Sequence, residues 1–398
     1  MISVDEARAR ILALMAPVGR ETVAITHAGG RVLAGDIAAR RTQPPFDASA
    51  MDGYAMRADE VHPGATFRVV GEAAAGHPFA GSVAPGETVR IFTGAPVPAG
   101  LTRIVIQEDV DRADDTVTLR GDLDPAPYLR RAGLDFSEGD TLLTAGTRLT
   151  PENIALLAAA GHAFVTAHRK PRVTLLATGD ELALPGDPAR EGGIVSSNNF
   201  GLAALVESLG GLAEILPIAP DETEELRRLA LEGAQADLFV TLGGASVGDH
   251  DLIRPALTGH GLDLDLYKVA MRPGKPLMAG RLNGTPMLGL PGNPVSAMVC
   301  GRVFLAPALD ALSGMVPRAP DLRDAVLETD ISRNGPREHY TRARCTLRDG
   351  VLHVAPFDSQ DSSRLALLSE ANALLVRPVD DPARRAGDRV GVMPLDAT

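Results

Sequence analysis

The 398-residue chain has two cysteines, no tryptophan and few aromatic residues. Cys300 and Cys345 stand far apart, so we expect neither a disulfide framework nor a zinc site built from thiolates. The formal charge is −12, and no block of lysine and arginine is long enough to follow a phosphate backbone. Nucleic acid is therefore not an expected partner. A small anionic ligand remains compatible with this charge, because a few cations in one cleft set the local field.

The sequence also lacks a secretory start and an unbroken apolar run of membrane-spanning length. Residues 1–20 mix acidic and basic side chains with apolar ones at helical spacing, without a basic start before an apolar core. The most apolar stretches, 154–167 and 287–309, are interrupted by Gly, Pro, His or Arg. We therefore expect a cytoplasmic protein that does not bind membranes.

The length exceeds what one hydrophobic core usually supports, so we expect two to four compact units. A helix should open the chain, because apolar residues recur every three or four positions from Val4, behind Ser3 as a helix cap. Residues 46–140 have the short Val, Ile and Thr runs of a small β-rich insert. Residues 171–312 alternate strand-like and helix-like runs, which predicts a parallel sheet with helices on both faces. Short strands return after Pro317 and predict a terminal β-domain.

The predicted elements follow from these patterns and from the turn residues between them. A helix is expected at 151–160, with Pro at its first position and Gly161 as its stop. The predicted strands are 67–70, 88–92, 104–110, 116–119, 173–177, 214–218, 238–242, 264–269, 287–290, 325–329, 339–347, 351–356 and 374–378. The predicted central helices are 201–209, 224–232 and 295–305.

Polar segments follow the predicted central strands, where an open α/β sheet binds its ligands. The strand that ends at Ala177 is followed by Thr178, Gly179 and the carboxylates of Asp180 and Glu181. A second strand is followed by a segment in which glycine N–H groups could converge on an anion and two carboxylates could hold a hard cation. Its members are Gly243, Gly244, Ser246, Gly248, Asp249 and Asp251.

Two further segments carry cations and a helix start. Lys268, Arg272 and Lys275 place three cations within eight residues, which suits the oxygens of phosphate or another oxyanion. In the other segment Pro291 and Pro294 fix a turn, after which a helix should begin with its N–H groups directed outward. Together the segments predict a pocket for a phosphorylated or oxyanionic ligand with a divalent cation.

Each segment also has a plainer interpretation. Glycine-rich turns often serve packing alone, 268–275 could be a solvated loop, and Asp180-Glu181 could simply begin a helix. Four polar segments at successive strand ends of one sheet favour the functional interpretation. The sequence has no phosphate loop ending in Gly-Lys-Ser/Thr, no dinucleotide fingerprint, no His-Glu-x-x-His helix and no Gly-x-Ser-x-Gly elbow. A nucleophilic serine and a bound nicotinamide therefore lack support.

Six segments, taken in order along the chain, give more specific information about the function than the polar loops do. They are Ser-Ala-Met-Asp-Gly-Tyr-Ala at 49–55, Ile-Phe-Thr-Gly-Ala-Pro-Val-Pro at 91–98, Thr-Gly-Asp-Glu-Leu at 178–182, Gly-Gly-Ala-Ser-Val-Gly at 243–248, Arg-Pro-Gly-Lys-Pro at 272–276 and Leu-Pro-Gly-Asn-Pro at 290–294. In identity and order they resemble the MoeA family, over essentially the whole chain. The resemblance implies a molybdopterin molybdotransferase, which inserts molybdate into adenylylated molybdopterin and releases AMP as the final step of molybdenum cofactor biosynthesis.

The resemblance also implies an α/β multidomain fold. Its parts would be a split, elongated, dimerising domain I (1–45 and 139–170), a β-rich insert as domain II (46–138), a central three-layer α/β/α molybdopterin-binding domain III (171–316) and a C-terminal β-barrel domain IV (317–398). Family members are homodimers, in which domain III of one subunit faces domain II of the other. Asp52, Thr93 and Asp135 would therefore act across the subunit interface.

Residues that match the family's site follow from the same resemblance. The implied catalytic residues are Asp52, Thr93, Asp135, Glu181, Asp221, Asp251 and Lys268. The implied substrate-binding residues are Thr178, Gly179, Asp180, Gly243, Gly244, Ser246, Gly248, Arg272, Lys275, Pro291, Pro294, Arg342 and Ser362, the last two on the oxyanion side. Mg²⁺ would be held by Glu181, Asp221, Asp251 and, from the other subunit, Asp52. The molybdopterin adenylyltransferase and molybdoenzyme chaperones are candidate partners.

Alternatives accompany this resemblance. Residues 51–53 could be only a turn, 131–135 a salt-bridged loop, and Arg342 part of an exposed strand face. Many relatives have Lys in place of Arg272, which changes donor geometry and bears on oxyanion preference, and many have Val in place of Ala245. The alternative functions are molybdopterin adenylyltransferase, which would not explain the additional domains, and a non-enzymatic dimeric scaffold like gephyrin. Nothing in the sequence resembles the extra linker and amino-terminal domain of gephyrin.

Overall fold

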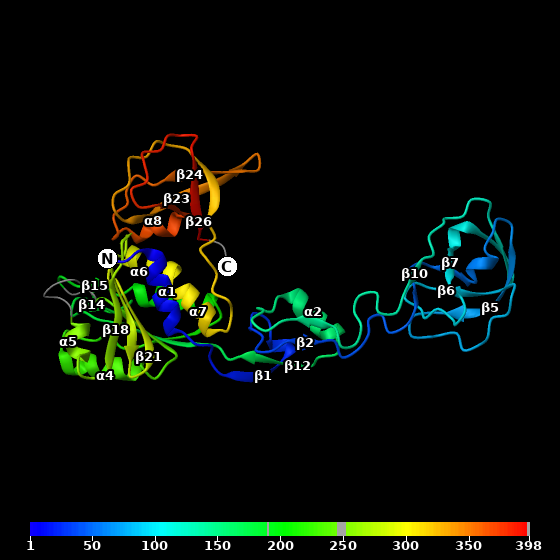
Figure 1. Cartoon of the computed structure of the whole chain (residues 1–398), viewed down its shortest axis with the longest axis horizontal. Coiled ribbons are helices and arrows are strands. Elements are labelled where there is room, and N and C mark those ends of the chain that lie inside the picture. Colours follow the sequence, from blue (N-terminus) through cyan, green and yellow to red (C-terminus); the bar gives the residue numbers. More distant parts are fainter. Residues whose placement is uncertain (189–190, 245–251, 396–398) are drawn as a thin grey trace.

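The computed structural model describes residues 1–188, 191–244 and 252–395. The molecule is elongated (Figure 1), with an α/β unit at one end that carries a β-barrel, a slender middle unit, and a β-rich insert at the other end. Both termini lie at the end formed by the α/β unit and the barrel. The multidomain fold expected from the sequence is confirmed, whereas the domain boundaries given above stay predictions.

The first helix is confirmed by its cap and by its buried face. Helix α1 (Val4–Leu14) begins after Ser3, whose Oγ accepts a hydrogen bond from the Glu6 N–H at 3.1 Å. Val4, Ala7 and Ile11 are buried, and they pack into the core of the central α/β unit rather than into the slender unit. The N-terminal segment is therefore tied to the unit that carries the polar loops.

The central sheet is parallel only in part. Its strand order is β16-β13-β17-β21-β20-β18, with parallel pairing from β16 to β21 and antiparallel pairing at β20 and β18. The strands are β13 (Arg172–Ala177), β16 (Leu212–Ile215), β17 (Leu238–Leu242), β18 (Leu262–Lys268), β20 (Pro276–Leu282) and β21 (Thr285–Leu290). The expectation of a wholly parallel sheet was wrong at this edge, and strand β20 was missed.

The antiparallel edge has a local cause in the sequence. Strands β20 and β21 are joined by Asn283 and Gly284, with φ angles of 49° and 86°. An Asn-Gly pair with both φ angles positive is typical of a two-residue hairpin whose twist matches that of the strands. This dipeptide was the available signal for the additional strand.

Helices cover both faces of the central sheet, which confirms the three-layer arrangement. One face packs against α1, α3 (Asn198–Ser208), α6 (Pro294–Cys300) and α7 (Ala306–Leu312). The other packs against α4 (Thr223–Gly233) and α5 (Ile253–Leu257), with Phe239 fully buried between them and the sheet. Burial on both faces explains the continuous apolar runs of β13 and β17.

Helices α6 and α7 are joined by a π-helical turn, η4 (Gly301–Leu305), into one helical run from Pro294 to Leu312. The expectation that this apolar stretch is broken early was wrong, because the helix continues through Arg302. By length and composition the run could cross a membrane, but 78% of its most apolar window is buried inside the protein. Its apolar side chains belong to the core of the central unit.

The C-terminal region forms the expected β-barrel. Its strands are β22 (Arg323–Leu327), β23 (Glu338–Arg348), β24 (Val351–Pro356), β25 (Ala373–Arg377) and β26 (Arg389–Pro394), together with helix α8 (Leu365–Glu370). The order β23-β24-β22-β26-β25 closes because β25 also pairs with β23. A short strand from the central unit, β19 (Met271–Arg272), pairs with β23 from outside this ring and joins the two units.

Two distant segments of the chain build the slender middle unit. Strand β1 (Arg20–Ala24) pairs with β12 (Phe164–His168), and β2 (Ile37–Ala38) pairs with β11 (Thr141–Leu143). Helix α2 (Pro151–Ala159) was predicted from Pro151 and Gly161, and the structure adds a capping box between Thr150 and Asn153. The short helix η1 (Ile25–His27) contacts it. Leu33, Leu149 and Leu157 share one small core, so the unit is split between two parts of the sequence.

The insert is a β-rich unit, as predicted. Its sheet has the order β7-β4-β6-β5-β9-β8. The elements are β4 (Gly53–Met56), β5 (Thr66–Ala73), β6 (Glu87–Ile91), β7 (Arg103–Ile106), β8 (Val110–Ala113), β9 (Thr116–Leu119), and the turns η2 (Ala58–Glu60) and η3 (Gln107–Asp109). Strands β3 (Ala48–Ser49) and β10 (Leu129–Arg130) pair where the chain enters and leaves the insert. Two buried clusters, around Phe67 and around Ile91, give the insert its own core.

The hairpin between β20 and β21 supports a direct prediction about stability. Replacing Gly284 by Ala should lower the free energy of unfolding by about 1–2 kcal/mol, because a Cβ is strained at this positive φ. The open space around the position leaves no steric clash to confuse the result. Gly284→Asn is the matched control and should lose less, because Asn tolerates the left-handed region. Urea unfolding measures the difference, and equal losses for both variants would contradict the hairpin geometry.

Candidate active site

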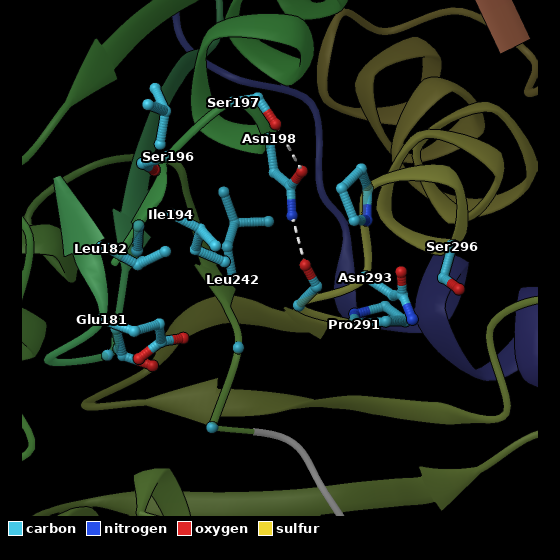
Figure 2. A pocket seen from close by; sticks show the side chains of 18 of the residues that line it. Glu181, Leu182, Ile194, Ser196, Ser197, Asn198, Leu242, Pro291, Asn293 and Ser296 are labelled. Atoms are coloured by element: carbon cyan, nitrogen blue, oxygen red, sulfur yellow. Dashed lines mark hydrogen bonds between the residues drawn. The ribbon is translucent and has the colours of Figure 1, made fainter. Parts of the chain in front are cut away.

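A cavity of about 610 Å³ opens at the carboxyl ends of the parallel strands β13, β17 and β21. Figure 2 shows the side chains that surround it, with Glu181 at one end and the start of α3 opposite the 291–294 loop. Its lining includes these residues of the predicted site: Thr178, Gly179, Glu181, Asp221, Gly243, Gly244, Pro291 and Pro294. The structure therefore brings together the loops after three strands, as the rule for open α/β sheets predicts.

The loop after β13 places a carboxylate over the strand end. The N–H of Thr178 donates to the carbonyl of Leu242, and the N–H of Gly179 donates to that of Ala219, both at 3.1 Å. Gly179 has φ 142°, and a Cβ at this position would clash with the carboxylate of Glu181. Glycine is favoured here by the positive φ, and its lack of a Cβ leaves room for the Glu181 carboxylate.

Two exposed carboxylates, those of Glu181 and Asp221, line the cavity. Asp180 does not line it, because its Oδ1 accepts a hydrogen bond from the Asp221 N–H at 3.0 Å and thereby orients the turn that carries Asp221. Within residues 1–188, 191–244 and 252–395 no group of three or more His, Cys, Asp or Glu side chains is placed to hold a metal. The predicted metal ligand Asp251 lies outside the described residues.

The glycine segment after β17 approaches the Thr178 loop closely. Gly243 and Gly244 have φ angles of 89° and 63°. A Cβ on Gly243 would lie 3.0 Å from the Thr178 carbonyl oxygen, and one on Gly244 would lie 2.8 Å from Cγ1 of Ile253. Both positions thus require glycine. Ser246 and Gly248, predicted to continue this segment, lie outside the described residues.

The loop after β21 is held from two sides. The carbonyl of Gly292 accepts a hydrogen bond from Nδ2 of Asn198 at 2.7 Å. At the start of α6 the N–H of Val295 donates to the carbonyl of Ser362 at 3.1 Å. This N–H was expected to point outward toward a ligand, but it has a backbone partner in the barrel. Ser362 therefore contacts the helix that borders the cavity.

Sequence analysis missed one wall of the cavity. It is formed by the short strand β15 (Ile194–Val195), which pairs with β14 (Leu182–Ala183), and by the start of α3, and its lining residues are Ile194, Val195, Ser196, Ser197 and Asn198. The available signal was the Ser-Ser-Asn-Asn run at 196–199 before an apolar helix, which is typical of a helix start. Helix starts that follow a strand are also frequent ligand sites.

The predicted cations lie beside this cavity and do not line it. Lys268 ends β18, Arg272 lies in β19, and Lys275 directly precedes Pro276, which lines the cavity. Arg272 pairs in register with His339 of the barrel. Burial, and then the nearby charge of Arg272, lower the pKa of His339 to about 4. Several arginines therefore lie near His339, at the border between the central unit and the barrel.

Arg342 is buried rather than exposed, with 1% of its surface accessible. Its Nη1 donates to the carbonyl of Arg364 at 2.9 Å, and its Nη2 donates to those of Ser359 and Asp361 at 3.2 and 2.8 Å. The interpretation of Arg342 as part of an exposed strand face was therefore wrong. Its guanidinium holds the loop that carries Ser362, and its role as an oxyanion ligand stays a prediction.

Two of the predicted residues of the insert, Asp52 and Thr93, contact each other. The N–H and the hydroxyl of Thr93 both donate to Oδ1 of Asp52, at 2.8 and 2.7 Å. These two hydrogen bonds hold the pKa of Asp52 below its ordinary value. Asp135 is exposed, and its N–H donates to the carbonyl of Gln43 at 3.0 Å. The insert and the central unit, whose residues line the cavity, lie at opposite ends of the molecule (Figure 1), so one chain does not bring these residues to the cavity.

Two insert segments have the local structure that their plainer interpretations predicted: a turn at 51–53 and a salt-bridged loop at 131–135. The hydroxyl of Ser49 donates to the carbonyl of Met51 at 2.6 Å, which makes a tight turn before Asp52. Arg131 forms an ion pair with Asp47 at 2.7 Å. These contacts fix the backbone near Asp52 and Asp135, and both are compatible with a role for those carboxylates.

Family models match three consecutive regions of this chain. Residues 2–161 match the MoeA N-terminal region (domain I and II), residues 174–311 a probable molybdopterin binding domain, and residues 324–395 the MoeA C-terminal region (domain IV). A relative in Mycobacterium tuberculosis named molybdopterin molybdenumtransferase 2 is 36% identical over 410 residues, covering 99% of this chain and 100% of the relative. The chain belongs to the MoeA family.

Further MoeA relatives agree with this assignment. A molybdopterin molybdenumtransferase of Haemophilus influenzae is 33% identical over 401 residues, covering 100% of this chain and 99% of the relative. A solved structure of the molybdopterin biosynthesis MoeA protein from Pyrococcus horikoshii is 27% identical, with a TM-score of 0.80 over 99% of this chain and 100% of that chain. The similarity therefore extends across all the units of the fold.

The Asp52–Thr93 contact predicts a change in proton affinity. Replacing Thr93 by Val removes the hydroxyl donor and keeps the backbone N–H, so the pKa of Asp52 should rise but stay below its ordinary value. Wild-type Asp52 should accordingly stay ionised to lower pH than the variant does. Carboxyl ¹³C NMR titration of the full chain measures both. Thr102→Val is the control, because the Thr102 hydroxyl accepts from Ala58 instead; an unchanged Asp52 pKa in Thr93→Val would contradict the contact.

The contacts of Arg342 predict a large difference between two arginines of one strand. Replacing Arg342 by Lys should cost about 2–4 kcal/mol of stability, because buried carbonyl groups lose donors that a single ammonium cannot replace. Arg344→Lys is the matched control and should change stability by less than about 0.5 kcal/mol, because Arg344 is exposed and its contacts with Glu370 and with the ring of Phe357 are long surface contacts. Thermal and urea unfolding provide the comparison. Equal stabilities would show that the guanidinium does not hold the loop.

Proposed function

We propose that the chain is a molybdopterin molybdotransferase that inserts molybdate into adenylylated molybdopterin and releases AMP. The observation that carries the proposal is the full-length similarity to relatives named molybdopterin molybdenumtransferase. The cavity at the strand ends supports it, because carboxylates, closely packed glycine loops and a helix start converge there. The residues in the cavity are those expected for a ligand that carries phosphate groups.

The cavity suits a large, partly polar substrate. A volume of about 610 Å³ falls within the usual size of small-molecule and cofactor sites. We place the phosphates of the substrate over the loop that begins at Gly243 and Gly244, with Ser246 and Gly248 completing it. Thr178 and Gly179 then lie below the substrate, and Pro291 and Pro294 shape the side next to α6.

The donor set fits Mg²⁺ by its chemistry. This cation keeps several waters and is usually bound through one or two carboxylates together with phosphate oxygens of the substrate. Glu181 and Asp221 supply two such carboxylates at the same cavity. Asp251 of the same chain and Asp52 of a second copy complete the proposed ligands. When bound there, Mg²⁺ would neutralise charge that develops on the phosphoanhydride of the substrate.

Molybdate is proposed to arrive at the positive border between the central unit and the barrel. Lys268, Arg272 and Lys275 come from the central unit at this border, and Ser362 reaches it from the barrel. Burial is the main cause of the low pKa of His339 at this border, and the nearby charges of Arg272, Arg377, Arg337 and Arg342 lower it further. Arg342 would act chiefly by holding the Ser362 loop, in addition to any direct contact with the oxyanion.

A homodimer completes the proposed site. Asp52, Thr93 and Asp135 lie at the far end of the elongated chain, so they can approach a cavity only if a second copy is arranged alongside. We propose that domain II of one copy faces the cavity of the other, in the cytoplasm. The two alternative functions, adenylyl transfer and a non-enzymatic scaffold, are less well supported, because the named relatives match this chain over its full length.

Activity of the purified chain tests the function. With adenylylated molybdopterin and molybdate, the protein should release AMP together with molybdenum cofactor. Replacing Glu181 by Gln should lower the rate of AMP release at least about 100-fold without unfolding the protein. The substitution removes the negative charge of a proposed Mg²⁺ ligand and keeps the shape of the side chain. Asp140→Asn, at an exposed position in the slender unit, is the control. Full activity of Glu181→Gln, or no AMP release by the wild-type chain, would refute the assignment.

Mixing two inactive variants tests the shared site. Glu181→Gln and Asp52→Asn should each be inactive alone, because each homodimer has two defective sites. After denaturation and refolding together, random pairing makes half of the dimers mixed, and one site of each mixed dimer is intact, so about one quarter of the wild-type activity should return. Absence of recovery, with mixed dimers demonstrated by differential tagging, would place Asp52 and Glu181 in separate processes.

A further inference from the structure

One side chain spans two walls of the cavity. Asn198 is the first residue of α3, and its Nδ2 donates to the carbonyl of Gly292 at 2.7 Å, across 94 positions of the sequence. Its Oδ1 lies 3.3 Å from the hydroxyl of Ser197. Figure 2 shows the Asn198 amide directed at the 291–294 loop, with Glu181 at the far end of the cavity. The bridge therefore lies within the binding site and away from the proposed metal ligands.

The bridge is one link in a chain of close approaches. Gly292, which accepts the hydrogen bond, lies so near the glycine segment that an added Cβ would be 3.4 Å from the Cα of Gly243. Gly243 in turn lies against the carbonyl of Thr178. Movement of the Gly292 carbonyl would therefore be transmitted to the loops proposed to hold the phosphates of the substrate.

Asn198 also lies between two cavities. A second cavity of about 420 Å³ adjoins α3, α6 and α8, and it shares only Ser197 and Asn198 with the cavity at the strand ends. Its lining is largely apolar and includes Met298, Leu368 and Leu374. The polar bridge from Asn198 to Gly292 thus lies where a polar site borders an apolar space. Polar groups of a substrate would lose hydrogen bonds in the apolar cavity, so a polar substrate binds more favourably in the cavity at the strand ends.

We propose that Asn198 is a positioning residue of the active site. Its amide fixes the distance between the start of α3 and the 291–294 loop, and thereby sets the cavity for adenylylated molybdopterin. The inference rests on the proposed function for its substrate, but the bridge itself can be tested without any substrate. An amide donor is required, since a carboxylate of the same shape would face the Gly292 carbonyl with a second acceptor.

Kinetics of three variants test this role. In Asn198→Ala and Asn198→Asp, kcat/KM for adenylylated molybdopterin should fall about 10- to 100-fold, because small displacements of a positioned substrate have effects of this size. The KM for molybdate should change less than about 2-fold, because the proposed oxyanion residues do not line this cavity. Ser208→Ala is the matched control, since it removes a 2.8 Å hydrogen bond at the other end of α3. Unchanged kcat/KM, or an equal rise in both KM values, would overturn the proposal.

Hydrogen exchange keeps the test independent of catalysis. In the full chain without substrate, the backbone amides of Gly292, Asn293, Val295 and Ser296 should exchange about 10-fold faster in both Asn198 variants than in the wild type or in Ser208→Ala. If the wild type releases no AMP but this difference is found, the proposed function fails and the bridge stands. If exchange is the same in all proteins, the positioning role fails whatever the activity. Asn198→Asp keeps the side-chain shape and serves where Asn198→Ala does not fold.

Discussion

The parallel alignment of β13, β17 and β21 is the constraint on which the site depends. Parallel strands end at the same edge of a sheet, so the loops that follow them must meet there, however far apart they are in sequence. Helix layers on both faces bury these strands and fix their register. Because the loops begin on rigid strands, Thr178, Gly243 and Pro291 are positioned by the fold itself. Local glycines then allow the close approaches that this convergence imposes.

The barrel is joined to the central unit by backbone contacts, which makes its position specific. Strand β19 pairs with β23, and the carbonyl of Ser362 accepts a hydrogen bond from the first turn of α6. The Ser362 loop has this shape because the buried guanidinium of Arg342 donates to three of its carbonyl groups. A change deep in the barrel can therefore reach the cavity through α6. The cations at the border are Lys268, Arg272 and Lys275, whereas the contact between Ser362 and α6 helps to set the shape of the cavity.

Sequence alone predicted the parts of the site that depend on local pattern. Gly179 and Pro291, which line the cavity, were predicted because they follow apolar strands, whereas the insert residues come from the MoeA resemblance and their part in the site stays a prediction. Strand β20 was missed because strands and helices were expected to alternate throughout this region, whereas Asn283-Gly284 joins two consecutive strands in a hairpin. Neither the burial of Arg342 nor the contact of Asn198 with Gly292 follows from local pattern. Both depend on partners many residues away, which only the assembled fold brings close.

The elongated shape separates folding from completion of the site. The slender unit, the insert and the barrel each have a buried cluster of their own, and the core of the central unit extends to Tyr340, Leu374 and Met393 of the barrel, so a buried core supports every part of one chain. The cavity of one chain, in contrast, has the carboxylates of Glu181 and Asp221 but lacks those of the insert. If Asp52 comes from a second copy, as we propose, dissociation would abolish activity while leaving most of the folded structure intact. The activity of such a site would depend on the concentration of the protein, because only the dimer brings the two halves of the site together. Each half is already formed in the separate chain.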